Sequence, residues 1–386
     1  MRANAAASSV RALTAPGGAG GLSAPYRSPG GMVRRLLSAL LPAVALLTAA
    51  GPARADQPVS SHAMVHTCCT PPGMKERMFA EAAASGAEFI RVDVELGGIF
   101  AAGPEPPDWR ALDGIIGLAE RHSLRVLGVI LGTPNWLSSC PERGAEAALC
   151  PPRDPAEFGR LAAEVAAHAR GSIRHWEILN EPDADWAFKG TAEDYARMLS
   201  AAYDAIHARV PEARVVLGGV ERPREHEWSE RMLATPGADA ARKFDIAALH
   251  LRLRLRNVLA DLPVYLRSYR ELLAARGFRG PVWVTEHGYP ADPAFQWDPA
   301  YRGGDAAQAA FLRDSIPRLT AAGADQVFVT LRDNLWGEYL SEGLVHIDEA
   351  VPTYPAARRP AFETVREQSG ELDLEMLVEL LQSWWL

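Results

Sequence analysis

Acidic residues at the amino terminus, cysteines and long apolar runs are all scarce in this 386-residue chain. Residues 1–55 contain six arginines but no Asp, Glu or Lys, and the apolar run 36–50 is only about 15 residues long, which is too short to cross a bilayer comfortably. The basic start, apolar middle and small-x-small exit predict an export signal that is cleaved after Ala55. Translation is expected to begin at Met32, because residues 1–31 fit poorly in front of such a signal. The product is predicted to be secreted or periplasmic, without a transmembrane segment in the mature chain.

Basic residues are too few to favour binding to nucleic acid. Removal of the six amino-terminal arginines leaves 34 basic against 48 acidic residues, a formal charge of −14. An anionic protein of this kind is repelled by the phosphate backbone, so nucleic acid is excluded as a partner. The remaining 331 residues suffice for one elaborated α/β barrel, a fold that routinely exceeds ~250 residues as a single domain.

Only four cysteines are present: Cys68, Cys69, Cys140 and Cys150. Thiols of exported chains normally oxidise, and Cys140 and Cys150 would close a short loop as a natural bridge. The adjacent pair allows a vicinal bridge or cross-links to the other two cysteines. A metal site that includes His62 and His66 is a further alternative, but nothing nearby completes a recognised zinc pattern. No metal and no cofactor are predicted.

Short runs rich in Val, Ile and Leu alternate with longer Ala-rich amphipathic runs after Ala55, which predicts parallel strands linked by crossover helices. The eight expected strands are centred near Met64, Ile90, Leu127, Trp176, Val216, Ala247, Val282 and Phe328. Helices are expected over residues 75–85, 108–121, 156–169, 192–208, 264–275 and 306–321. The pattern predicts an α/β fold, a single-domain (β/α)8 TIM barrel over residues 56–371. Residues 372–386 predict a short C-terminal amphipathic helix that packs on the barrel or docks on a partner or membrane surface.

Two of the expected strands end on a glutamate. The fourth strand runs into Asn180-Glu181, and the seventh ends on Glu286. An ionised carboxylate taken out of water costs several kcal/mol unless it is paired or chemically useful, and barrel enzymes carry their chemistry at the C-terminal ends of strands. Cleavage of a glycosidic bond needs an acid and a second carboxylate across the anomeric carbon. A gap of ~5–5.5 Å between them gives retention and ~6.5–9.5 Å gives inversion, and the sequence does not fix this distance.

The geometry of these strand ends is partly constrained by side-chain alternation. Strict alternation would place Asn180 and Glu181 on opposite faces, so the strand end must twist or bulge for both to reach one sugar. Arg91 and Asp93 alternate with apolar residues on the second strand, although parallel barrel strands are usually apolar on both sides. Both are therefore expected to face the lumen, where Arg91 would help to keep Glu286 ionised.

The stretch around Asn180-Glu181 and the strand end at Glu286 resemble clan A retaining glycoside hydrolases, most closely the family 39-like and cellulase-like secreted glycosidases. The resemblance spans most of residues 61–371. It implies that Glu181 is the acid/base, that Glu286 is the nucleophile and that Asn180 holds the sugar 2-hydroxyl. Those roles agree with physical expectation, because an acid must keep its proton near neutral pH while a nucleophile must lose it.

Neighbouring positions follow the family's pattern unevenly. His250 matches a recurrent histidine at the end of strand six, but Arg252 stands where a tyrosine is expected. Strand eight keeps a Leu-Arg-Asp ending that contains Arg332, yet residues 329–330 occupy the place of an aromatic platform under the sugar. Trp336, in the following loop, is expected to substitute for that platform.

Other side chains on the mouth-side loops are candidates for binding a glycan. The aromatic candidates are Trp136, Trp186, Tyr289, Trp297 and Tyr301, since sugar C–H faces stack on rings; each could equally be packed within its loop. His250, Arg252, Arg254 and Arg256 alternate with leucines and would share one face of a strand-like extension. With Arg332 they are a candidate site for uronate, sulfate or another anionic group, the alternative being exposed or internally paired arginines.

The predicted function is therefore that of a monomeric secreted retaining glycoside hydrolase acting on a poly- or oligosaccharide by double displacement. A transglycosylase on the same site and a catalytically inactive glycan-binding barrel are the alternatives. A metal-dependent hydrolase could use His66, His250 and His287, but no HxH or HExxH signature supports it.

Overall fold

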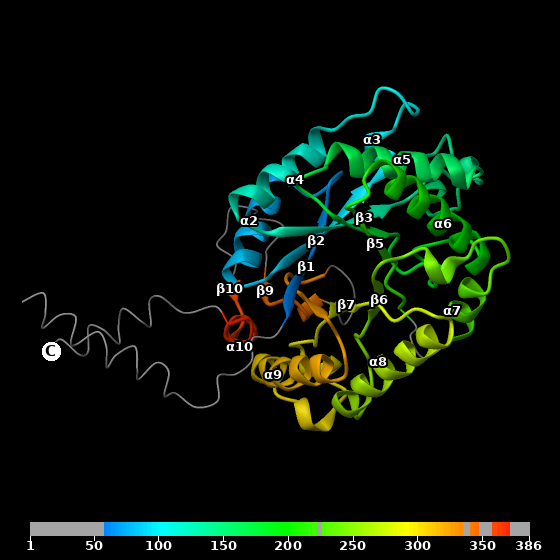
Figure 1. The fold of residues 1–386 in the computed structure, drawn as a ribbon. Helices are drawn as coiled ribbons and strands as arrows, with labels where there is room; N and C mark the ends of the chain where they lie inside the picture. Colours follow the sequence, from blue (N-terminus) through cyan, green and yellow to red (C-terminus); the bar gives the residue numbers. More distant parts are fainter. Residues whose placement is uncertain (1–57, 222–225, 335–339, 347–356, 371–386) are drawn as a thin grey trace, which may run out of the picture. The chain divides into compact units, whose positions relative to one another are not determined.

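The computed structural model describes residues 58–221, 226–334, 340–346 and 357–370, and it contains the predicted ring of eight parallel strands (Figure 1). The strands are β1 (Val59–His66), β2 (Phe89–Glu95), β3 (Arg125–Leu131), β4 (His175–Ile178), β5 (Arg214–Leu217), β6 (Ala247–His250), β7 (Val282–His287) and β8 (Gln326–Thr330). Their order in the sheet is β5-β4-β3-β2-β1-β8-β7-β6. Parallel bridges from Val216 to Ile246 and from Val220 to Leu249 join the two ends of that order, so the barrel closes. All eight predicted strand centres fall in or beside these strands.

Helices surround the sheet on its outer side (Figure 1). They are α2 (Pro72–Ala84), α3 (Leu96–Ile99), α4 (Arg110–Arg121), α5 (Pro155–His168), α6 (Ala192–Arg209), α7 (His226–Leu233), α8 (Val258–Ala275), α9 (Asp305–Ala321) and α10 (Pro360–Gln368). The six predicted helices correspond to α2, α4, α5, α6, α8 and α9. The loop after β8 leads to a short antiparallel pair, β9 (Val345–His346) and β10 (Ala357–Arg358). None of the helices that the structure describes is both long enough and apolar enough to span a membrane.

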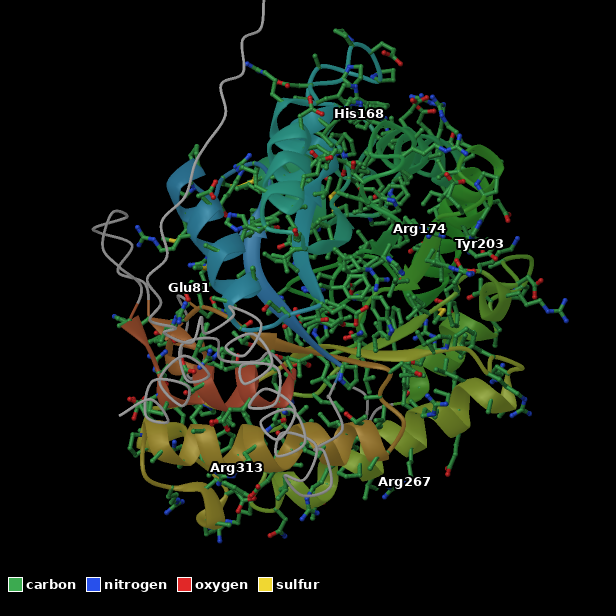
Figure 2. The ribbon with its side chains drawn as sticks, turned by 60° about the vertical axis from the view of Figure 1, so that its left-hand side comes forward. Glu81, His168, Arg174, Tyr203, Arg267 and Arg313 are labelled. Carbon is green, nitrogen blue, oxygen red and sulfur yellow. A yellow bond between two sulfur atoms is a disulfide. The ribbon has the colours of Figure 1, made fainter. Side chains whose placement is uncertain are left out.

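Local sequence explains where several helices begin. Asp154 caps α5, because its side chain accepts from the backbone N–H of residue 156, and a proline occupies the first helical position. Thr191 and Asp194 form a capping box at the start of α6. The outward faces of the helices are charged, and Arg267 on α8 and Arg313 on α9 are exposed and point away from the barrel (Figure 2).

Apolar side chains fill the part of the lumen that lies below the strand ends. One buried cluster consists of Phe89, Leu127, Val216, Ile246, Ala248, Trp283 and Phe328. Packing between strands is equally tight at Gly128, where an added Cβ would lie 2.5 Å from the buried Trp176 ring. Because apolar side chains fill this part of the lumen, a ligand site is expected at the C-terminal ends of the strands, which is its usual position in a barrel.

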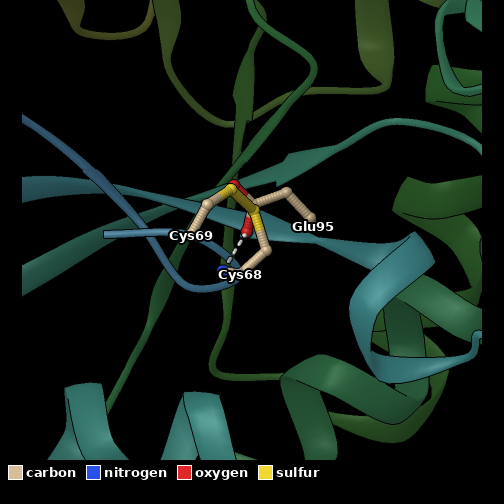
Figure 3. A group of neighbouring side chains, drawn as sticks. All are labelled: Cys68, Cys69 and Glu95. Atoms are coloured by element: carbon tan, nitrogen blue, oxygen red, sulfur yellow. Dashed lines mark hydrogen bonds between the residues drawn. A yellow bond between two sulfur atoms is a disulfide. The ribbon is translucent and has the colours of Figure 1, made fainter. Parts of the chain in front are cut away.

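The four cysteines are joined as two neighbouring pairs. Cys140 is bonded to Cys150 across the loop after β3, and Cys68 is bonded to Cys69 in the loop after β1 (Figure 3). The predicted export signal of residues 1–55, Trp336 and the predicted amphipathic helix over residues 372–386 all lie outside the described residues.

Candidate active site

The two predicted glutamates converge at the mouth of the barrel. Glu181 follows β4 and Glu286 lies near the end of β7, and their exposed fractions are only 6% and 3%. One oxygen of each carboxylate and one ring nitrogen of His250 lie within 4.8 Å of one another. These two oxygens are therefore closer than the ~6.5–9.5 Å that an inverting glycosidase leaves between its carboxyl groups.

The backbone after β4 leaves the strand geometry, as the alternation argument required. Leu179 has a φ of 62° and Glu181 a φ of 46°, in the left-handed region that non-glycine residues seldom adopt. As a result Asn180 and Glu181 both reach the site, although strict alternation would separate them. The Asn180 Oδ1 accepts from Arg91 at 2.8 Å, and the Glu181 Oε1 lies 3.0 Å from the His250 Nδ1. Strained backbone of this kind is characteristic of functional sites.

Arg91 faces the lumen and connects the two strand ends. It is 2% exposed, and its Nη1 donates to the Glu286 Oε1 at 2.9 Å. Its Nε and Nη2 donate to the two oxygens of Glu177 at 2.7 and 3.0 Å. Glu177 also accepts from the backbone N–H of Gly219 at 2.9 Å. The sequence analysis did not single out Glu177, although a charged residue inside an otherwise apolar strand was a signal for it.

Arg252 is the second guanidinium of the site and stands among three carboxylates. Its Nη2 lies 2.5 Å from the Glu286 Oε2 and 3.6 Å from the Glu181 Oε1, and its Nη1 lies 3.3 Å from the Glu342 Oε2. Each oxygen of Glu286 is thus paired with a different arginine. The replacement of the expected tyrosine by arginine places a permanent charge beside the predicted nucleophile.

Glu342 is a site residue that sequence analysis missed. It is 2% exposed, and the Thr330 hydroxyl donates to its Oε2 at 3.2 Å. A Cβ on Gly288 would lie 2.6 Å from the Glu342 carboxyl carbon, so the glycine makes room for this carboxyl. Burial raises the pKa of Glu342 above its ordinary value, and the Arg252 charge offsets only part of that rise. No local pattern marks Glu342, because it lies in a loop rather than at a strand end.

The pKa of Glu286 lies well below its ordinary value. Burial alone would raise this pKa, but the positive charges around the carboxylate, with Arg252 the largest contributor, together outweigh burial. Glu286 is therefore ionised across the neutral and mildly acidic range, as a nucleophile requires. Burial lowers the pKa of His62 well below 6.5, and the arginines add to the effect while Glu286 opposes it. His62 is consequently neutral beside Glu286, with its Nε2 3.6 Å from the Glu286 Oε1.

The expectation that Glu181 keeps its proton near neutral pH does not hold for the site without substrate. Burial raises the pKa of Glu181, and the negative Glu286 raises it further, but the hydrogen bond to His250 and the charges of His250 and Arg252 lower it more. The net pKa is below the ordinary value. The Trp186 Nε1 donates to the Glu181 Oε2 at 2.8 Å, and a donor of this kind also favours the ionised form.

The predicted single face of four cations does not form. The strand ends at His250, and residues 251–255 continue without strand pairing. His250 and Arg252 turn inward because buried carboxylates attract them, whereas Arg254 and Arg256 are exposed. Arg332, which was grouped with these cations, is 8% exposed and its Nη2 donates to the backbone carbonyl of Met64 at 3.3 Å.

Two of the predicted sugar-stacking residues are packed within the protein. Tyr289 is 4% exposed, its ring stacks on Phe311 at 4.2 Å, and its hydroxyl donates to the Tyr301 carbonyl. Trp136 is half-buried, and its Nε1 donates to the carbonyl of Phe100 at 2.8 Å. Tyr289 therefore offers no open ring face to a sugar. The Tyr289 ring packs against the apolar Phe311 of α9 instead of lining the mouth of the barrel.

Two other aromatic rings remain exposed at the mouth. Trp186 is 56% exposed beside Glu181, and Trp297 is 49% exposed in a small hollow that Arg252, Arg254 and Glu342 also line. These two rings have the accessibility that stacking on a sugar requires.

Metal binding fits neither group of candidate ligands. Glu181, His250 and Glu286 approach one another closely enough to share an ion, but each oxygen of Glu286 is already paired with a guanidinium. A divalent cation placed there would be repelled by two fixed positive charges. Cys68 and Cys69 also approach Glu95, but their sulfurs are bonded to each other and are not thiolate ligands.

The fold is similar to that of solved glycoside hydrolases, which share the barrel. A family 39 glycoside hydrolase from the gut symbiont Bacteroides cellulosilyticus matches with a TM-score of 0.59 and 15% identity, over 82% of this chain and 64% of that one. An exo-β-1,4-mannosidase from an Opitutaceae bacterium matches with 0.58 and 17%, over 81% and 59%. A family 39 β-xylosidase from Caulobacter crescentus matches with 0.58 and 18%, over 82% and 73%. The chain thus spans less than two thirds of the first two. No family model matches the sequence, and no curated protein does.

Proposed function

We propose that the protein is a retaining glycoside hydrolase in which Glu286 is the nucleophile and Glu181 the acid/base. The observation that carries this proposal is the approach of two buried carboxylates to within 4.8 Å from two different strand ends. Both carboxylates are costly to bury unless they are paired or take part in chemistry. The fold that the chain shares with glycoside hydrolases supports the same conclusion.

The proposed reaction has two displacements. In the first, Glu286 attacks the anomeric carbon and forms an ester while the glycosidic C–O bond breaks, and Glu181 gives its proton to the departing oxygen. In the second, Glu181 takes a proton from water, whose oxygen attacks the anomeric carbon and releases Glu286 as a carboxylate. Configuration is retained after two inversions. Because the pKa of Glu181 lies below its ordinary value, the active form, with Glu181 protonated and Glu286 ionised, is expected on the acidic side of neutral.

Asn180 is proposed to hold the sugar 2-hydroxyl. Because Arg91 donates to the Asn180 Oδ1, the amide of Asn180 is oriented with its NH2 group as the donor available to a sugar. Hydrogen bonds to the 2-hydroxyl strengthen as the oxocarbenium-like transition state forms. Arg91 therefore positions Asn180 and Glu286 through one guanidinium group.

Two substitutions test the division of roles. Glu286→Ala is expected to abolish turnover of aryl glycosides, because no nucleophile remains. Glu181→Ala is expected to slow substrates with poor leaving groups sharply while sparing those with good ones, and azide should rescue it as a glycosyl azide. Near-normal turnover by Glu286→Ala, or near-normal turnover of substrates with poor leaving groups by Glu181→Ala, would refute the assignment. The anomeric configuration of the first product, read by NMR, tests retention, and the product pattern separates hydrolysis from transfer to a second sugar.

An anionic group on the substrate is a narrower proposal for the same site. It is supported by the hollow in which Arg252 and Arg254 lie beside the exposed ring of Trp297. Arg254→Ala is expected to lower the ratio of turnover of uronate-containing to neutral oligosaccharides. Arg256→Ala is the matched control, because Arg256 is also exposed and lies two residues further along the same segment. An unchanged ratio in Arg254→Ala would remove the idea.

Export with cleavage after Ala55 is proposed on the composition of residues 1–55. Expression of the full chain in a bacterial host should yield an extracellular or periplasmic product whose sequence begins at Asp56. A product that stays in the cytoplasm with its first 55 residues intact would contradict this.

A further inference from the structure

A second hollow opens beside the ends of β1 and β2, between α2 and α4. Its volume is about 640 Å³, and residues that line it include Thr67, Cys68, Lys75, Glu95, Gly98 and Asp108. That volume lies within the ~300–1,000 Å³ range of small-molecule sites. Charged side chains from both helices line the same hollow, next to apolar ones such as Ile99 and Leu118. None of the residues assigned above to the proposed reaction lines it.

One strand connects this hollow with the catalytic carboxylates. Arg91, Asp93 and Glu95 are alternate residues of β2 and so face the same side. Arg91 donates to Glu286 at one end. At the other end Glu95 is hydrogen-bonded to the backbone N–H of Cys68 at 3.1 Å. At a rise of ~3.3 Å per residue, about 13 Å separate the first and last of these three positions.

His66 of β1 covers the middle of this polar track. Its Nδ1 lies 3.2 Å from Asp93 and 2.8 Å from Glu95, and its side chain is 41% exposed. Beyond the buried Arg91, the track therefore offers His66, Asp93 and Glu95 as groups that can exchange hydrogen bonds with sugar hydroxyls.

The disulfide turn, residues 66–70, is held rigidly although it is exposed. Glu95 accepts from the Cys68 N–H and from the Thr67 hydroxyl, and the Lys75 Nζ donates to the Thr67 carbonyl at 2.7 Å. Figure 3 shows Glu95 beneath the bonded pair of sulfurs. Both cysteines are exposed. The turn thus presents a fixed, polarisable and apolar surface to solvent, and a ligand would pay little entropy to order it.

We propose that the disulfide turn and the hollow beside it form a remote subsite that binds a saccharide unit of the glycan away from the cleaved bond. This inference rests on the proposed hydrolase function. The C–H face of a sugar ring would lie on the Cys68–Cys69 bridge, and its hydroxyls would meet the charged lining of the hollow. The distance along β2 exceeds one sugar ring, so only substrates of several units reach both sites. The enzyme is then selective for longer chains.

Two neighbouring glycines of α3 provide a matched test. An added Cβ on Gly98 would lie 4.0 Å from the Cys68 Cβ, whereas one on Gly97 would have no neighbour within 4 Å. Gly98→Phe therefore places a ring against the disulfide turn, and Gly97→Phe adds the same ring elsewhere on the same exposed helix turn. The substrates are a ladder from disaccharide to hexasaccharide prepared from the polysaccharide that the enzyme cleaves, together with an aryl monoglycoside.

The measured quantity is the ratio of kcat/KM for the hexasaccharide to kcat/KM for the aryl monoglycoside. Gly98→Phe is expected to lower this ratio about 10-fold, the scale of one lost stacking contact, and Gly97→Phe should keep the wild-type ratio. The double substitution Cys68→Ser, Cys69→Ser removes the bridge without adding bulk, and it should lower the ratio in the same way.

Each outcome decides a different point. A wild-type ratio in both Gly98→Phe and the double serine variant would overturn the remote subsite while leaving the hydrolase function intact. A wild-type enzyme that cleaves no glycoside would instead overturn the proposed function. If the serine variant fails to fold, the comparison of Gly98→Phe with Gly97→Phe still decides the matter.

Discussion

Glu181 and Glu286 face the same space, yet their surroundings differ in kind. Glu286 is paired with two arginines, whose charges are permanent. Glu181 is contacted by an imidazole and an indole N–H, and Arg252 reaches it only at 3.6 Å. Glu286, which the proposed reaction requires to stay ionised, is thus paired with charges that are permanent.

Glu181, which in the proposed reaction gains and loses a proton in each cycle, has the imidazole of His250 as its nearest side-chain partner on one oxygen. The comparison shows that the partners distinguish two buried glutamates of one site, because the pKa of both is lowered but that of Glu286 is lowered further. Three substitutions can each remove one of these partners, and Arg91 is the most deeply buried of the three.

Removal of Arg91 should have the largest effect. Arg91→Ala leaves Glu177 and Glu286 without their shared cation in a buried site, so the free energy of unfolding should fall by about 3–5 kcal/mol at pH 7. The pKa of Glu286 is below its ordinary value, so its stabilisation is present above about pH 4.5 and is lost as the pH falls further. The loss caused by the variant should therefore shrink in strong acid. Urea unfolding at several pH values measures this.

Two controls sharpen the Arg91 result. Arg91→Lys keeps a charge but loses the planar fork that contacts Glu177 through two bonds, and it should be intermediate. Arg267→Ala, on the exposed face of α8 (Figure 2), should change stability by less than about 0.5 kcal/mol. Equal stability of Arg91→Ala and the wild type would show that the buried ion pairs contribute nothing.

Removal of Arg252 should change the pH dependence more than the stability. Arg252 lowers the pKa of both Glu286 and Glu181, and turnover requires protonated Glu181, so activity falls as the pH rises through the pKa of Glu181. Arg252→Met should raise this pKa and move the falling limb of kcat/KM to higher pH. The double variant with Glu342→Gln avoids leaving Glu342 as a buried charge without its arginine. Arg256→Met should leave the profile in place, and an unshifted limb in Arg252→Met would contradict the electrostatic role.

The barrel could be predicted from the sequence because its signals are local. Runs of β-branched residues bounded by Ala-rich amphipathic segments mark each strand and helix, and all eight strands were found in this way. Helices α3, α7 and α10 were not predicted, because runs of only four to nine residues give too short a pattern to recognise. The two glutamates could also be predicted from the sequence, since a carboxylate at the end of an apolar strand is unusual unless it is paired or takes part in chemistry.

Contacts between distant segments could not be predicted in the same way. Glu342 comes from a loop, and only folding brings it to Arg252, 90 residues earlier. The alternation of arginine and leucine after His250 is the pattern expected of a strand. Arg252 instead forms an ion pair with the buried Glu286, and residues 251–255 do not continue the strand. Tyr289 comes directly after β7, a position from which a side chain could contact a sugar. Its ring is buried because it stacks on Phe311. In each case a tertiary partner outweighs the local pattern.

Removal of the indole N–H from Glu181 should have the smallest effect of the three. Trp186→Phe keeps most of the ring and deletes the hydrogen bond from the Trp186 Nε1 to the Glu181 Oε2. Loss of a donor to the charged form raises a carboxyl pKa, so the falling limb of kcat/KM should move to higher pH by less than in Arg252→Met. A net hydrogen bond is worth about 0.5–1.5 kcal/mol, which corresponds to a change of roughly 2- to 13-fold in kcat/KM for substrates with poor leaving groups.

Trp109→Phe is the control, because that ring stacks on His168 outside the site. A shift in Trp186→Phe that equals the shift in Arg252→Met would show that the indole, rather than the guanidinium, sets the protonation of Glu181.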